Sequence, residues 1–457
     1  MQTKSHSRFE TAKILILGVV AVSTLFAGFA FNTWGIADPK SFEHFQRDGE
    51  SLIIGRLVKS RQDGIFSAGG LTGADIAHSL HDTWITPRES DRQYLAYFDD
   101  IPPERYSPYL SQVGGQGMMF SMLDRLVRIS STRTKYQILR ILTALLSATI
   151  LALVVTWFHK EFGLGSAILV LASLVLSQWL TLFGRNLWWS LWAFYLPMLL
   201  LMVFLRHKPL TEKQQFLQLG GLAALAVFAK CFFNGYEFIT TALVMLSVPF
   251  VYYAIQRRMD LRTIFRGAAS VVLGASAGLI LSVVILLIQI GTAQGNPFGG
   301  LEHLTATLEK RTYGDASDFN SEFADSLQAS PLGVTWNYVN GPYLELGNAP
   351  NSAGQDSVIE IRYGHLIASF AVMSILALFV RTRTHSPADR QRDIALVGAA
   401  WFSMLAPLSW FVIFKSHSYI HTHVNFIIWQ MPFTLFGFAV WGVVIQRGFL
   451  AWTHRAG

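Results

Sequence analysis

The stretch from Ile14 to Phe31, ILILGVVAVSTLFAGFAF, contains no charged residue and follows the cations Lys4, Arg8 and Lys13. One helical crossing of a bilayer needs about 20 apolar residues, so this stretch predicts a membrane-spanning helix. The cations before it predict a cytoplasmic N-terminus. Gly28-Phe29-Ala30 resembles a signal-peptidase site, but the apolar run is longer than that of a signal peptide, and we expect an uncleaved first helix.

The composition is that of a membrane protein. Of 457 residues, 52% are hydrophobic and only 14% are charged, whereas soluble domains carry about 25% charged residues. The formal charge of +7 comes from short basic clusters between apolar segments, and membrane topology explains this pattern without nucleic-acid binding. Cys231 is the only cysteine, which excludes an intrachain disulfide and a cysteine-rich metal site.

Apolar segments recur along the whole chain, and we expect an all-α integral membrane fold that forms one polytopic domain over residues 1–457. If successive spans cross the membrane in alternating directions from a cytoplasmic N-terminus, every short basic loop and the C-terminus lie in the cytoplasm. Two long polar segments, 34–136 and 292–362, are then external loops with amphipathic surface helices. The ten predicted spans are residues 13–33, 137–158, 163–183, 186–205, 214–232, 236–256, 264–291, 363–381, 393–415 and 423–446.

A basic cluster just before the second span departs from this charge rule, because it lies on the external side. It contains Arg125, Arg128, Arg133, Lys135 and Arg140. Two interpretations remain open, a solvated basic face and a surface for the phosphate headgroups of membrane lipids.

Polar residues with specific chemistry gather at the external ends of the predicted spans. Ionisable groups at the hydrocarbon boundary cost a few kcal/mol unless they are paired, hydrated or facing a cavity, so a cluster predicts a polar cavity open to the outside. Arg185 and Lys230 have a second interpretation, as anchors whose heads reach the interface. The predicted substrate- and phosphate-binding residues are Arg185, Lys230, Tyr236, Glu237, Lys415, His417, His421, His423 and Asn425.

The histidines His417, His421 and His423 also suggest a divalent metal, with Asp48 or Glu50 folded over them. Their spacing matches no strong zinc signature, and hydrogen bonding to a phosphate or sugar is the favoured interpretation. We therefore predict no required cofactor and no resident metal.

The external acids Asp48 and Glu50 are the predicted catalytic groups. Acids one residue apart point in different directions on a helix or strand, so one is expected to act as the working group and the other as its support. Asp48 has a second interpretation, as the cap of the following helix. Gly49 allows close approach of the backbone to a ligand, and residues 51–59 predict an amphipathic helix on the membrane surface.

A second stretch of the first external loop, residues 109–117, combines glycines with Gln112 and Gln116 just before an apolar run. It predicts either a backbone pressed against substrate, with the two glutamines binding it, or a turn that starts a helix.

In this layout the chain resembles the C-superfamily (GT-C) glycosyltransferases, integral-membrane enzymes that use polyprenyl-phosphate sugars. The shared features are the first span followed by a long external loop, the early acids in Arg47-Asp48-Gly49-Glu50, surface helices before the second span, and about ten spans. The stretches 184–189, 234–240 and 415–423 also resemble proteins of bacterial envelope polysaccharide synthesis. The chain departs from this family in two ways. The family often has adjacent acids, whereas Gly49 separates them here, and many members carry a C-terminal periplasmic domain, which we do not expect here.

The resemblance implies sugar transfer from a polyprenyl-phosphate donor to an envelope glycan or glycolipid, at the outer face of the bacterial cytoplasmic membrane. Asp48 would act as general base, with Glu50 as the other choice, and the external cations and histidines would hold the phosphate. An envelope polysaccharide polymerase and a lipid-linked glycan flippase are the alternatives. A flippase would be expected to have internal repeats and polar residues in the middle of spans.

Overall fold

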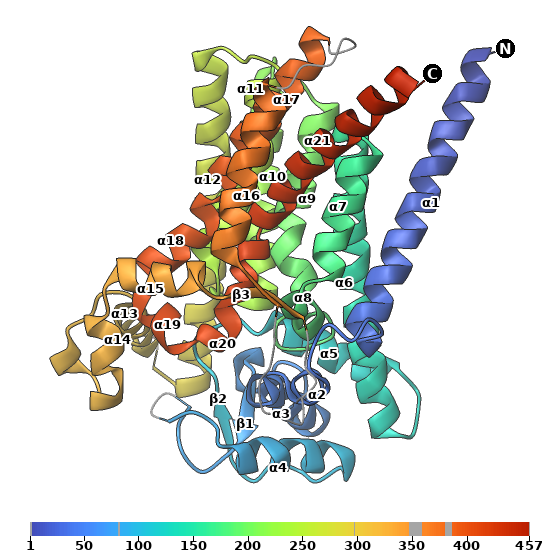
Figure 1. The fold of residues 1–457 in the computed structure, drawn as a ribbon. Coiled ribbons are helices and arrows are strands. Elements are labelled where there is room, and N and C mark those ends of the chain that lie inside the picture. Colours follow the sequence, from blue (N-terminus) through green and yellow to red (C-terminus); the bar gives the residue numbers. More distant parts are fainter. Residues whose placement is uncertain (1, 81–82, 297, 347–358, 380–385, 457) are drawn as a thin grey trace, which may run out of the picture.

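The computed structural model describes residues 2–80, 83–296, 298–346, 359–379 and 386–456. A helical bundle forms one half of the molecule (Figure 1). The two long polar segments fold together at one end of this bundle and form the other half, which we call the external half after their predicted location. Both chain termini lie at the end of the bundle opposite these segments. The bundle helices are α1 (Gln2–Phe31), α6 (Thr132–Phe162), α7 (Leu164–Val175), α8 (Gln178–Phe183), α9 (Leu191–His207), α10 (Lys213–Asn234), α11 (Ile239–Gln256), α12 (Leu261–Gln294), α16 (Tyr363–Phe379), α17 (Pro387–Ser403), α18 (Leu405–Ile413) and α21 (Phe433–Ala456).

Six helical stretches are long and apolar enough to cross a membrane. A seventh is obtained if the bent pair Thr422–Gln430 and Phe433–Phe449 counts as one broken span. The remaining predicted spans are helical but short: residues 163–183 form α7 and α8 with a break between them, while α9 and α16 each have 17 residues. A mainly helical fold with helices able to cross a membrane is therefore observed, and the count of ten crossings stays a prediction.

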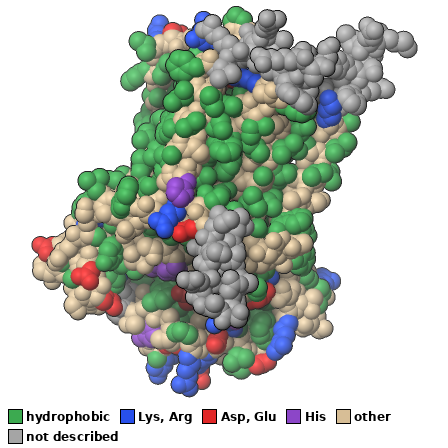
Figure 2. All heavy atoms as spheres, viewed as in Figure 1, with side chains coloured by type: hydrophobic (Ala, Val, Ile, Leu, Met, Phe, Trp, Pro, Cys, Tyr) green, Lys and Arg blue, Asp and Glu red, His purple; other side chains and the backbone are tan. Residues whose placement is uncertain are grey.

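The outer surface of the bundle is apolar. Leu273 on α12 is 71% exposed and Leu15 on α1 is 68% exposed, and Figure 2 shows hydrophobic side chains along the flank with cations at the rim near the termini. A soluble protein would not leave such a large apolar belt in water, and the belt is compatible with a surface that meets lipid.

Small residues bring α10 and α12 into close contact. A Cβ atom added to Gly274 would lie 2.0 Å from the Gly220 carbonyl oxygen, and one added to Gly278 would lie 2.2 Å from that of Ala224. Between membrane helices, dispersion contacts of closely packed backbones replace the hydrophobic effect as the source of association. The Gly274-to-Gly278 spacing is the small-xxx-small pattern that permits this packing.

The external half consists of short elements from both polar segments. The first segment contains α2 (Pro39–His44), α3 (Arg47–Asp63), η1 (Ser67–Gly70), β1 (Gly73–Asp75), α4 (Pro87–Phe98), β2 (Tyr106–Pro108) and α5 (Gly115–Leu126). The second contains α13 (Gly299–Arg311), η2 (Ala316–Asp318), η3 (Ser321–Phe323), α14 (Ala324–Gln328), α15 (Pro331–Val339), β3 (Pro342–Leu346) and β4 (Ile359–Arg362). The late elements α19 (Lys415–Ile420), α20 (Thr422–Asn425) and η4 (Phe426–Gln430) lie against them. The strands pair antiparallel, β1 with β2 and β3 with β4.

Helix α3 is the centre of the first segment, which corrects the expectation of a surface helix over residues 51–59. The helix forms, but all of its residues from Gly49 to Val58 are buried. Arg56, although charged, is fully buried and donates hydrogen bonds to the carbonyl oxygens of Gly64, Ile65 and Ser67. Hydrogen bonds make the burial of an ion tolerable, and those from the two terminal nitrogens of Arg56 tie the following loop to the helix.

Candidate functional site

Asp48 occupies the first turn of α3 at the boundary between the external half and solvent. Its side chain is half-buried, and its Oδ2 atom accepts one hydrogen bond from the Trp84 indole at 2.8 Å. The residue that precedes the helix, Gln46, caps it with a left-handed backbone and no side-chain cap. Asp48 is thus inside the helix and does not act as its N-cap.

The three histidines lie next to this turn. Gln46 Nε2 is 3.2 Å from His423 Nε2, and the ring centroids of His423 and His421 are 5.7 Å apart. The His421 and His417 centroids are 4.4 Å apart. An amide nitrogen only donates, so His423 Nε2 is the acceptor and its Nδ1 carries the proton in the neutral ring. Asp48 is close enough to His423 to act on it electrostatically.

Glu237 anchors the far side of the histidine row. It lies in the turn between α10 and α11, with Oε1 2.6 Å from Arg311 Nη1 and Oε2 3.2 Å from His417 Nε2. Burial alone would raise its pKa, but Arg311 and His417 hold the pKa of Glu237 well below its usual range. Burial also lowers the pKa of His417 and of His421. At neutral pH the cluster therefore holds a carboxylate, a guanidinium and neutral imidazoles.

An aromatic row closes the cluster between Asp48 and Arg311. The Trp84 and Tyr109 rings are 5.7 Å apart, Tyr109 and Trp188 are 5.4 Å apart, and Arg311 Nη2 is 3.4 Å from the Tyr109 hydroxyl. Gly49 lies against the same row, since a Cβ atom added there would be 3.2 Å from Trp188 Cδ1. The close approach predicted for Gly49 is therefore to an indole ring.

Glu50 points away from this cluster into the protein. It is 4% exposed, and its carboxylate accepts hydrogen bonds from the Tyr94 hydroxyl at 3.0 Å, the Tyr136 hydroxyl at 2.8 Å and the Leu187 backbone N–H at 3.0 Å. The Coulomb field of Glu50 also acts on Arg185. These partners occupy both oxygens and join α3 to α4, α6 and the loop before α9.

Three of the cations predicted to bind phosphate donate hydrogen bonds to protein carbonyl oxygens, and their phosphate-binding role stays a prediction. Arg185 donates to Ala30 and Phe42 and pairs with Glu43 at 2.8 Å. Lys230 donates to Gly235 and Glu237, and Lys415 to Leu327 and Ala329. All three are buried. Lys230 bonds to carbonyl groups of the turn that follows α10, whereas Arg185 and Lys415 join segments that are distant in sequence.

The neutral residues of the predicted site are scattered around the cluster. Gln112 and Gln116 lie buried beside Gly235 and Trp188, and Gln112 Nε2 and Gln116 Oε1 have no hydrogen-bond partner among the described residues. The Tyr236 hydroxyl faces Ser282 of α12 at 3.5 Å, and Asn425 is buried beside Tyr338. The buried, unpaired amide atoms mark space for water or for a polar group of a ligand.

Residues that the sequence did not single out complete the cluster. Arg311 comes from the second external segment, Trp84 and Gln46 from the first. Arg311 is the last residue of α13. Only the fold shows that its guanidinium reaches the carboxylate of Glu237, 74 positions earlier in the chain. Tyr109 and Trp188 lay at the edges of stretches that the sequence did mark.

Among the described residues, no group of three or more histidine, cysteine or acidic side chains is arranged to hold a metal ion. Comparison of the chain with protein-family models, with curated proteins and with solved structures gives no match.

Proposed function

We propose that this chain is an integral-membrane glycosyltransferase that moves a sugar from a polyprenyl-phosphate donor to an envelope glycan or glycolipid. One observation supports this proposal above all: Asp48 lies beside the row His423, His421 and His417, which Glu237 and Arg311 hold in place. A half-exposed carboxylate next to hydrogen-bond donors is the pairing that base-assisted displacement of a phosphate requires.

Asp48 is the general base in this mechanism. It has one hydrogen-bond partner and a solvent-facing edge, whereas the oxygens of Glu50 are occupied by two tyrosines and a backbone amide. Asp48 removes the proton from the acceptor hydroxyl, whose oxygen forms a bond to the anomeric carbon. The bond from that carbon to the phosphate oxygen breaks, and the polyprenyl phosphate leaves with the bonding electrons.

The charge that develops on the leaving phosphate requires donors on the side opposite the base. Since Arg185, Lys230 and Lys415 are bound to backbone carbonyls, we assign this task to the imidazole N–H groups of His421 and His423. Glu237 and Arg311 orient the histidine row through His417. Neutral donors in a fixed array stabilise developing charge without needing to reorganise.

The bundle geometry is compatible with a site at the outer face of the bacterial cytoplasmic membrane. The cluster lies in the external half, at the end of the bundle away from both termini (Figure 1). With cytoplasmic termini, the polyprenyl-phosphate donor and the growing glycan would meet Asp48 on the periplasmic side.

Replacement of Asp48 tests this function. The full-length protein is purified in lipid nanodiscs and assayed with a panel of polyprenyl-phosphate hexoses and pentoses and a cell-envelope glycolipid extract as acceptor. Loss of a general base costs about 100-fold or more in rate, so we expect Asp48→Asn to lower transfer by about 100-fold while its melting temperature stays unchanged. Asp63→Asn, an acid near the other end of α3 that pairs with Lys59, is the matched control and should transfer normally. Equal transfer by both variants would sink the assignment.

A further inference from the structure

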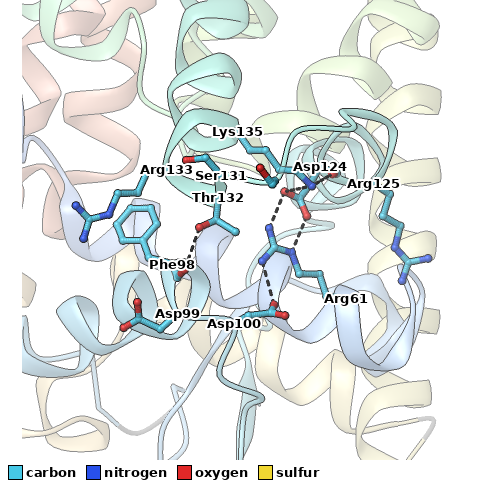
Figure 3. Close-up of a pocket in the computed structure, with 11 residues that line it drawn as sticks. Arg61, Phe98, Asp99, Asp100, Asp124, Arg125, Ser131, Thr132, Arg133 and Lys135 are labelled. Carbon is cyan, nitrogen blue, oxygen red and sulfur yellow. Dashed lines mark hydrogen bonds and ion pairs between the residues drawn. The ribbon is translucent and has the colours of Figure 1, made fainter.

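A hollow of about 720 Å³ opens where α5 meets α6, at the far end of α3 from Asp48 (Figure 3). Asp48 and Arg61 lie on the same helix, about 20 Å apart at 1.5 Å per residue. The hollow is lined by residues from the end of α3, the end of α4, α5 and the start of α6: Arg61, Phe98, Asp99, Asp100, Asp124, Arg125, Ser130, Ser131, Thr132, Arg133 and Lys135. It is separate from the glycosyl-transfer site, and a ligand bound in it would be independent of that function.

The floor of the hollow is a fixed ion-pair network. Asp124 is buried and accepts two hydrogen bonds from Arg61, at 2.8 and 2.9 Å, and one from the Tyr97 hydroxyl at 2.6 Å. Lys135 donates to the Asp124 backbone carbonyl at 2.8 Å, and Arg61 also reaches Asp100 at 3.2 Å. The acids of the floor are thus neutralised by cations that the fold holds in place.

The rim carries the remaining positive charge. Arg125 donates to the Ser60 carbonyl oxygen, and Arg133 lies 5.3 Å above the Phe98 ring. Within the described part of the chain, neither guanidinium has a carboxylate at ion-pair distance. The lining holds four cations, Arg61, Arg125, Arg133 and Lys135, against the three acids Asp99, Asp100 and Asp124. The excess charge therefore resides on two forked donors that match a phosphate group.

The surroundings of the hollow place it at the level of a membrane interface. Helix α6, a stretch able to span a bilayer, begins at its edge with Thr132. The same junction leaves large apolar side chains in the open, with Leu126 67% exposed and Met122 49% exposed. Interleaved arginines and exposed apolar residues are typical of segments that sit among lipid headgroups with their apolar side chains in the acyl region.

We propose that the rim of this hollow binds the phosphate groups of anionic membrane lipids. Arg125 and Arg133 lie at opposite sides of the hollow (Figure 3), and each binds the phosphate oxygens of a headgroup, while Leu126 and Met122, on the same helix as Arg125, contact acyl chains. Free phosphate shares the headgroup's chemistry, but the exposed apolar residues beside the guanidinium groups favour a lipid. Two members of the basic cluster that departs from the charge rule of the topology, Arg125 and Arg133, thus gain a role in anchoring the external half of the molecule against the bilayer.

Lipid titration of the full-length protein tests the proposal. In the first experiment, the protein in neutral detergent is titrated with phosphatidylglycerol or phosphatidylcholine, and bound lipid is counted by native mass spectrometry. In the second, its melting temperature is measured with added inorganic phosphate or glycerol 3-phosphate. Each cation near a lipid surface is worth about fivefold in affinity, so Arg125→Gln/Arg133→Gln should weaken phosphatidylglycerol binding by up to about thirtyfold. The control Arg88→Gln/Arg128→Gln removes the same charge from exposed positions outside the lining and should stay within about twofold of the parent.

Each result decides the matter. Preferential phosphatidylglycerol binding that falls only in Arg125→Gln/Arg133→Gln supports the lipid site. An arginine-dependent stabilisation by inorganic phosphate or glycerol 3-phosphate, with no lipid preference, overturns the lipid in favour of a soluble phosphate ligand. Equal lipid binding by both double variants overturns the site altogether. If the first double variant melts early, Arg133→Gln alone is used, because Arg133 is exposed and contacts only the Phe98 ring.

Discussion

Asp48 and Glu50 are two positions apart on α3, yet they occupy opposite kinds of surroundings. Glu50 is buried with three donors on its carboxylate, while Asp48 is half-exposed with a single indole partner. A separation of two residues turns a helix by about 200 degrees, so one acid faces the interior and the other the histidine row. The difference shows that packing gives two neighbouring acids different surroundings, and under the proposed function Glu50 serves stability and Asp48 the chemistry.

The largest expected effect comes from removing the buried member of the pair. Glu50→Ala leaves the Tyr136 hydroxyl and the Leu187 N–H unpaired, leaves Tyr94 only its 3.4 Å contact with the Arg47 carbonyl oxygen, and removes the negative charge near Arg140 and Arg185. Loss of one partner from a buried charged network costs about 3–5 kcal/mol. We expect a clear drop in the melting temperature of the purified protein in detergent, measured by intrinsic fluorescence.

The comparison is sharpened by Asp48→Ala, which removes a carboxylate from the same turn. Substitutions at partly exposed sites usually change stability by less than about 0.5 kcal/mol, so its melting temperature should stay close to that of the parent. Similar losses in the two variants would mean that the two acids share one structural role.

The sequence alone does not predict most of this difference between the surroundings of Asp48 and Glu50. Hydropathy predicts the helical bundle, because apolar stretches of the required length must be helices in a bilayer. It also predicts that polar residues gather at one end. Local sequence does not show which groups a charged side chain contacts in the fold. The sequence therefore marked Arg185, Lys230 and Lys415 as candidate ligand-binding cations, and the structure adds that each donates hydrogen bonds to nearby carbonyl groups. Arg311 was missed because its partner Glu237 lies on a distant segment.

The helix over residues 51–59 shows the same limit. Its apolar spacing correctly predicts a helix, but the pattern does not tell a membrane surface from the packed interior of an external loop. The helices α4 and α5 and the strand β1 pack against α3 and bury its middle part. Only the tertiary arrangement buries Arg56, which the sequence alone would place in solvent.

A smaller effect on stability is expected when the pH is lowered, because the histidines near Asp48 then titrate. Burial lowers the pKa of His417 and His421 below 6.5, so below that pH the unfolded chain binds more protons than the folded one. Stability therefore falls as the pH drops through this window. The pKa of Glu237 is also depressed, by Arg311 and His417 against the effect of burial, so its contribution is present above about pH 4.5 and is lost at lower pH. Melting temperatures between pH 7.5 and 4 should show a decline that steepens below 6.5.

His417→Gln/His421→Gln should flatten the upper part of this decline, since a neutral amide does not titrate. His207→Gln, at the exposed end of α9, is the control and should follow the parent curve. A parent stability that is level from pH 7.5 to 5 would contradict the buried, neutral state of the two imidazoles.

The smallest effect on stability, and the finest probe of the comparison, comes from the single partner of Asp48. Trp84→Phe keeps the contact with Tyr109 but removes the indole N–H that binds Asp48 at 2.8 Å. One exposed hydrogen bond is worth about 1 kcal/mol or less, so the melting temperature should move little, whereas a base that loses its orientation should lower kcat several-fold with KM unchanged. Trp34→Phe is a matched control, because Trp34 is also exposed and also donates one hydrogen bond, to the Thr24 carbonyl at 3.0 Å. A fall in kcat confined to Trp84→Phe would identify the indole as the group that orients Asp48, while equal kcat values for the two variants would leave Asp48 positioned by α3 alone.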